Sequence, residues 1–249
     1  MPTPFYHLAL AGALLADERL QPSTREFLTE TRPVFIFGNT APDVQTMSGE
    51  DRAATHFFHV PLRDKTPAYE TMFARYSQLS VAAALPKEQS AFITGYICHL
   101  LLDQLWIGEI LESYFGLEAT WENIRERLFL HNVMRIHIDR QDLAQLPSDL
   151  DIVLAQVQPS DWLPFVEDQH LRAWRDFVSV QLAPGADIQT VAVFAERMGR
   201  APSEFETLLD SPQRLQARLW ENIPRSELIS FRQRALAKSI ELVHSYLAL

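Results

Sequence analysis

A histidine and an aspartate lie four residues apart in a stretch that is otherwise largely apolar. The segment ITGYICHLLLDQLW, residues 93–106, places His99 and Asp103 among isoleucines and leucines. In an α-helix this spacing puts both side chains on one face. An unpaired carboxylate in an apolar interior costs several kcal/mol, so buried aspartates are usually paired or bound to a metal. The pattern therefore predicts that Asp103 has a partner elsewhere in the chain.

Three further potential ligands precede this pair. His7 lies in an apolar N-terminal segment, His56 precedes two phenylalanines, and Asp43 follows a proline in an irregular segment. Zinc is bound by histidine nitrogens and carboxylate oxygens, commonly four, and a catalytic zinc keeps one position for water. These residue types are sufficient for such a site. A core in which the same groups hydrogen-bond one another without a metal is the competing interpretation.

The surroundings of these residues form four motifs in a fixed order. They are an early histidine, G-N-x-x-P-D, T-H-F and G-Y-x-x-H-x-x-x-D, and this chain has them as MPTPFYHLALAGAL, FIFGNTAPDVQ, ATHFF and AFITGYICHLLLDQLW. In this order, over residues 1–115, the chain resembles the bacterial zinc-dependent phospholipase C family. The wider superfamily includes the zinc-dependent single-strand nucleases.

The resemblance implies an all-helical fold with the metal in a cleft between helices. Carried over residue by residue, it implies one zinc site formed by Asp43, His56, His99 and Asp103. It also implies that Asp103 bridges to a second metal beside His7. Asp43 and Asp103 are the residues to which we assign a catalytic role.

Additional candidates lie further along the chain. Family members hold a third metal with histidine and glutamate residues downstream of the helical pair, where this chain has Ile107 and Glu109. His131, Arg135 and Asp139 lie about one helical turn apart and would flank the site, Arg135 being suited to a substrate phosphate. Glu109 and Asp139 are candidates for an additional ligand or base. We expect one or two zinc ions, not three.

Other catalytic constellations are weakly supported. A di-iron bundle needs two Glu-x-x-His pairs and two more glutamates, and the chain contains Glu167…His170 and Glu241…His244 in segments that look like ordinary amphipathic helices. An adjacent His-Asp doublet and the H-E-x-x-H, P-loop and G-x-S-x-G patterns are absent. Cys98 is expected to be a packing residue.

Composition limits the partners and the compartment. The formal net charge of −10 argues against stable binding to a nucleic acid or an anionic membrane. A small phosphodiester, or by the resemblance a phospholipid headgroup, is the expected ligand. The single cysteine favours a reducing compartment. The N-terminus lacks the basic residues of a signal peptide, and no apolar run suggests a transmembrane segment, so we expect a cytoplasmic protein.

Helical periodicity dominates and predicts an all-α fold, a multi-helix orthogonal bundle of the phospholipase C and zinc nuclease type. We expect one domain over 1–249, with the metal site in 1–145 and helices of 146–249 packed on it. Residues 32–51 read as a short apolar run followed by a loop. Helices are expected near 5–16, 51–58, 67–84, 87–115, 120–141, 165–182, 187–198, 203–209, 212–222 and 226–247.

Together these features predict a zinc-dependent hydrolase that cleaves a phosphodiester with metal-activated water. The alternative is a non-catalytic helical binding or scaffold protein, in which the metal only holds the N-terminal half together. Oligomeric state and substrate identity have no sequence signal.

Overall fold

The computed structural model describes residues 1–186 and 188–248, and every regular element within these ranges is a helix. The predicted all-α fold is therefore confirmed. The α-helices are α1 (Pro4–Ala16), α2 (Pro22–Glu30), α3 (Arg32–Gly38), α4 (Gln45–Ser48), α5 (Arg52–His56), α6 (Ala68–Arg75), α7 (Lys87–Trp106), α8 (Ile124–Leu143), α9 (Leu150–Ala155), α10 (Asp168–Leu182), α11 (Thr190–Met198), α12 (Pro202–Leu209), α13 (Pro212–Leu215) and α14 (Arg225–Leu247).

Shorter turns complete the chain. There are 3-10 turns η1 (Ala41–Val44), η2 (Ser77–Leu79) and η3 (Ala82–Ala84), and π-helical segments η4 (Ile107–Phe115) and η5 (Gln216–Trp220). The segment η4 continues directly from α7, so the predicted helix 87–115 changes its hydrogen-bonding pattern after Trp106.

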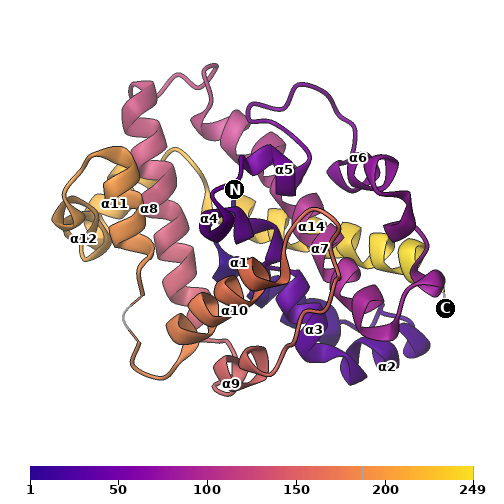
Figure 1. Cartoon of the computed structure of the whole chain (residues 1–249). Coiled ribbons are helices and arrows are strands. Elements are labelled where there is room, and N and C mark those ends of the chain that lie inside the picture. Colours follow the sequence, from indigo (N-terminus) through magenta and orange to yellow (C-terminus); the bar gives the residue numbers. More distant parts are fainter. Residues whose placement is uncertain (187, 249) are drawn as a thin grey trace.

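The central helix is α7. Most of its 20 residues are buried, and α3, α6, α14 and α1 all pack against it. A helix that is apolar on nearly all sides belongs in the interior of a fold. In Figure 1, α8, α11 and α12 lie together at one end of the molecule, and α2, α3 and the C-terminus lie at the other. Any polar residue on the inner part of α7 is therefore shielded from water.

Two glycines allow α3 and α7 to cross closely. A Cβ atom at Gly38 would lie 2.2 Å from the carbonyl oxygen of Phe92, and one at Gly95 would lie 2.2 Å from that of Phe35. No larger side chain fits at either position without moving the backbone. This close approach brings the end of α3, and the 3-10 turn that follows it, against the histidine-bearing part of α7.

The C-terminal helices cover the same region from the other side. Trp174 of α10 donates a hydrogen bond from its indole nitrogen to the carbonyl oxygen of Thr40 at 2.8 Å. From α14, Tyr246 donates to the carbonyl oxygen of Leu79 at 2.8 Å. The predicted domain range 1–249 includes residues 187 and 249, which lie outside the described residues, as does the start of the predicted helix 187–198.

One helical stretch has the length and apolarity of a membrane span. It runs from Lys87 to Phe115, and 78% of its most apolar window is buried within the fold. The core helix of a globular protein has the same properties. The expected absence of a transmembrane segment therefore stays a prediction.

Several element boundaries were predicted wrongly. Residues 32–51 were expected to become a loop, but they contain α3, η1 and α4, because Pro33 and Pro42 start helical turns instead of breaking them. The helix α2 was not expected, because only Thr24 and Leu28 of its face are buried. The predicted helix 67–84 ends at Arg75 and continues as two 3-10 turns.

Candidate metal centre

Four elements bring the five predicted ligands together. His7 comes from α1, Asp43 from η1, His56 from the last position of α5, and His99 and Asp103 from the middle of α7. Two overlapping groups have ligand atoms that all lie within 4.8 Å of one another: His7, His99 and Asp103, and Asp43, His56 and His99. His99 belongs to both groups. The cluster thus contains every residue that the sequence assigned to the metal site.

The spacing of the ligand atoms suits zinc. Atoms bound to one tetrahedral zinc at 2.0–2.1 Å lie about 3.3 Å from each other. His56 Nε2 lies 3.3 Å from His99 Nε2, 3.5 Å from Asp43 Oδ1 and 3.5 Å from Asp103 Oδ2. His99 Nε2 lies 3.6 Å from Asp103 Oδ2. These separations match those of ligands that share one ion.

Hydrogen bonds on the outer side of two rings fix which nitrogen faces inward. His99 Nδ1 lies 2.8 Å from the carbonyl oxygen of Asn39, which can only accept, so Nδ1 carries the proton. His56 Nδ1 lies 3.0 Å from the hydroxyl of Thr55 and 3.3 Å from the carbonyl oxygen of Arg52. In the neutral rings both Nε2 atoms then present lone pairs to each other. Such an arrangement needs a cation or a proton between them.

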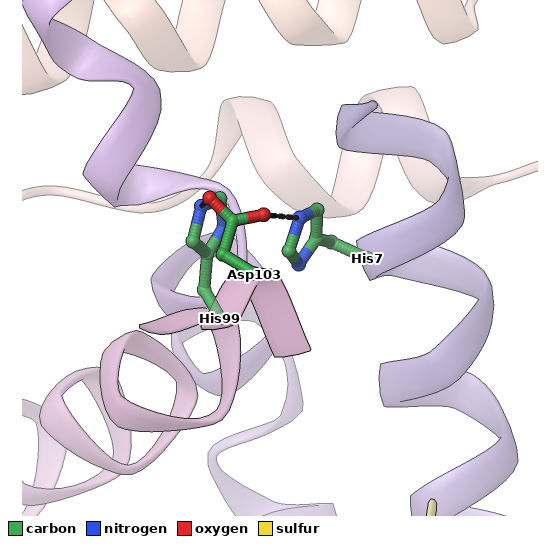
Figure 2. A group of neighbouring side chains, drawn as sticks. All are labelled: His7, His99 and Asp103. Atoms are coloured by element: carbon green, nitrogen blue, oxygen red, sulfur yellow. Dashed lines mark ion pairs between the residues drawn. The ribbon is translucent and has the colours of Figure 1, made fainter. Parts of the chain in front are cut away.

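His7 faces the other oxygen of the shared carboxylate. Its Nε2 lies 3.4 Å from Asp103 Oδ1, on the side of the carboxylate that faces α1 (Figure 2). Asp103 Oδ2 lies 3.5 Å from His56 Nε2 and 3.6 Å from His99 Nε2. Within the described residues, neither nitrogen of His7 nor Asp103 Oδ1 has a hydrogen-bond partner, although all three atoms are buried. Unsatisfied buried polar atoms are rare and require an explanation. A second ion between His7 Nε2 and Asp103 Oδ1 would satisfy these two atoms.

The electrostatics keep His7, His56, Asp43 and Asp103 in the forms that bind metals, whereas His99 is shifted toward its protonated form. Burial lowers the pKa of His7 to about 4 and that of His56 to about 4, so both rings are neutral at pH 7. Burial opposes the ionisation of Asp103, but His99, His7 and Arg52 hold its pKa well below the usual range. Burial likewise opposes the charge on Asp43, and His56 and His99 hold its pKa low. Burial disfavours protonated His99, but the charge of Asp103 raises the pKa of this ring above 6.5.

Arg52 is a residue of the cluster that the sequence analysis missed. Its Nη2 lies 2.5 Å from Asp103 Oδ2, and its side chain is 23% exposed. A guanidinium at this oxygen partly neutralises the carboxylate of Asp103. The sequence signal was its spacing, since Arg52 and His56 stand four residues apart on α5. Asn39 and Thr55, which orient the rings of His99 and His56, were also missed.

A cavity of about 360 Å³ adjoins the cluster. Asp43, Arg52 and Arg135 are among the residues that line it. The side chain of Asp43 is 21% exposed, whereas those of the other four ligands are 2% exposed or less. Asp43 is therefore the ligand through which a bound molecule in the cavity could meet the cluster.

The remaining candidates occupy other positions. Glu109 lies near the surface and pairs with Arg234 and Lys238. His131 accepts a hydrogen bond from the indole of Trp106 at 2.9 Å. Arg135 lines the cavity, and its role in phosphate binding stays a prediction.

Asp139 accepts hydrogen bonds from the hydroxyls of Thr3 and Thr190, and burial raises its pKa well above the usual range. In the described part of the chain, Glu109, His131 and Asp139 belong to neither metal-holding group, and the same holds for the Glu-x-x-His pairs at 167–170 and 241–244.

The residues present fit a metal. Neutral His7 and His56, two ionised carboxylates, matching separations and unsatisfied inward atoms occur together in one place. Comparison with known proteins adds nothing further, because no family model, curated protein or solved structure matches the chain.

Proposed function

We propose that this chain is a zinc-dependent hydrolase of a phosphodiester, similar to phospholipase C. The observation that carries the proposal is the convergence of His7, Asp43, His56, His99 and Asp103 beside a cavity. His99, His56, Asp43 and Asp103 Oδ2 would hold one ion, and His7 with Asp103 Oδ1 would hold part of a second.

A zinc ion held by these residues would supply a water of lowered pKa and neutralise charge on a phosphoryl oxygen. Asp43 is ionised and partly exposed to the cavity, so its carboxylate would accept a hydrogen bond from a water molecule beside the ion and orient it. Arg135 lines the same cavity and attracts the phosphate group of the substrate. Asp103 stays buried and holds the rings of His7 and His99 in place.

The alternative function is a helical binding or scaffold protein with a structural metal. The ion pair between Arg52 and Asp103 favours it, because this pair partly compensates the buried charge without any metal. A structural zinc is closed by four protein ligands, whereas a catalytic zinc retains an exchangeable position. The partial exposure of Asp43 to a cavity supports the catalytic proposal.

Hydrolysis of bis(4-nitrophenyl) phosphate across a range of pH tests the proposal. We expect turnover that a chelator abolishes and added zinc restores, and that is lost in His99→Ala. His59→Ala is the matched control, because His59 is exposed and lies outside both groups. A folded, fully zinc-loaded protein that hydrolyses no phosphodiester at any pH would support the scaffold function.

A further inference from the structure

The cavity beside the cluster has a cationic side that the metal ligands do not explain. Arg52, Arg135 and Arg197 all line it. Arg52 pairs with Asp103, but neither Arg135 nor Arg197 has a carboxylate within ion-pair distance in the described ranges 1–186 and 188–248. Arg197 is exposed, but Arg135 is half-buried, and a half-buried arginine without a counterion is unusual because desolvating a charge is costly. The cavity therefore has positive charge available for an anion.

Arg135 is held in one orientation. Its Nη1 donates to the side-chain oxygen of Asn132 at 2.9 Å, and its guanidinium carbon lies 4.3 Å from the centre of the Phe194 ring. Its Nε is buried and has no hydrogen-bond partner among the described residues. Burial lowers the pKa of Arg135 to about 10, so the group remains charged at neutral pH. A guanidinium fixed in this way can make paired hydrogen bonds to a phosphate.

Apolar side chains also line the cavity. Trp174, Phe177 and Val178 of α10 line it, together with Phe194 of α11 and Met47 of α4. Apolar side chains around a few convergent polar groups are typical of small-molecule sites, which usually measure about 300–1,000 Å³. At about 30 Å³ for each water-sized group, the 360 Å³ cavity encloses on the order of a dozen such groups.

We propose that this cavity is a substrate pocket for a small phosphodiester, in which Arg135 and Arg197 bind the phosphate and the aromatic side chains bind a compact apolar or aromatic ester group. This assignment rests on the proposed function in that it names the substrate of that reaction. Binding itself requires neither turnover nor a metal.

Calorimetric titration of the chelator-treated protein with phenylphosphonate tests the pocket, because this probe combines the dianion with an aromatic ring and is not hydrolysed. We expect Arg135→Met to weaken binding by roughly tenfold or more, since a charged hydrogen bond is lost. Arg125→Met is the control, because Arg125 lies exposed on the same helix and its substitution removes the same charge. Arg197 is exposed, so Arg197→Met provides a second variant whose folding is not at risk, and we expect it to weaken binding severalfold.

Two further probes test the two kinds of contact in the pocket. Inorganic phosphate lacks the ring and benzoate lacks the dianion, so each should bind roughly tenfold or more weakly than phenylphosphonate. The proposal is overturned if phenylphosphonate does not bind, if the Arg135 and Arg197 variants bind it like wild type, or if either simpler probe binds equally well. Binding without hydrolysis of any phosphodiester would contradict the proposed function and leave the pocket supported.

Discussion

The imidazole rings of His7 and His99 lie stacked, with centroids 3.7 Å apart and planes at 7°. Both rings are buried, and both have Nε2 close to the carboxylate of Asp103. Two protonated rings at this distance would repel each other strongly in a dry site. Burial and the neighbouring His99 accordingly lower the pKa of His7 to about 4. His7 is thus a neutral ring whose nitrogens serve no hydrogen bond within the described protein.

This relationship predicts opposite effects of His7→Phe on stability and on metal binding. A phenyl ring keeps the stack but removes two unsatisfied buried nitrogens, so the metal-free variant should be as stable as wild type or about 1 kcal/mol more stable. Its zinc content should fall, because Asp103 Oδ1 loses its partner ligand. Chemical denaturation and elemental analysis measure the two effects. A loss of several kcal/mol with unchanged zinc content would show that His7 has only a structural role.

Arg52 is expected to compete with the metal for Asp103. Removing the guanidinium in Arg52→Met leaves the carboxylate without its partner and should destabilise the metal-free protein by about 2–3 kcal/mol, somewhat less than for a fully buried pair. The same change frees Asp103 Oδ2, so zinc should bind more tightly and raise the melting temperature more than in wild type. Thermal unfolding with and without zinc checks both effects. Weaker zinc binding by the variant would refute the competition.

The crossing of α3 and α7 predicts a strong effect of one methyl group. Gly95→Ala places a Cβ against the carbonyl oxygen of Phe35, so it should cost about 3 kcal/mol or more and displace Asn39 from His99. Gly12→Ala is the control, because Gly12 lies in α1 with open space around it. This control should stabilise the protein by about 0.5–1 kcal/mol. Equal effects of the two substitutions in urea denaturation would contradict the packing described.

Acidification should destabilise the metal-free protein partly through His131. Burial lowers the pKa of His131 well below 6.5 in the folded chain, so only the unfolded chain takes up this proton as the pH falls through about 6.5. The stabilising contribution is complete above that pH and is lost below it, at up to about 1.4 kcal/mol per pH unit. His131→Gln keeps an acceptor for Trp106 and should flatten the pH dependence by this amount. Identical pH profiles for wild type and variant would contradict the assignment.

The sequence predicted part of this arrangement from local rules. The spacing of His99 and Asp103 on an apolar helix is a local signal, and α7 has the predicted position. Only the order of the motifs predicted that three more ligands belong to the site, namely His7, Asp43 and His56. No local signal shows this, because their convergence depends on how α1, η1 and α5 pack on α7. Arg52 was missed because its partner lies 51 positions away.

Local rules also failed where prolines begin short helices. The proline-rich segment that contains Asp43 reads as a loop, but it folds as a series of short turns held by the crossing of α3 and α7. Tertiary packing stabilises these turns, and each turn is too short for a periodic sequence pattern to predict it.

Zinc titration of the metal-free protein tests the central claim most directly. We expect wild type and the control His59→Ala to bind one or two zinc ions per chain. The double variant His99→Ala, Asp103→Ala should bind none, and circular dichroism should show that it remains helical. A folded wild type that takes up no zinc, or a double variant that takes up as much as wild type, would contradict the metal centre. The cluster would then be a buried network of histidines, carboxylates and Arg52.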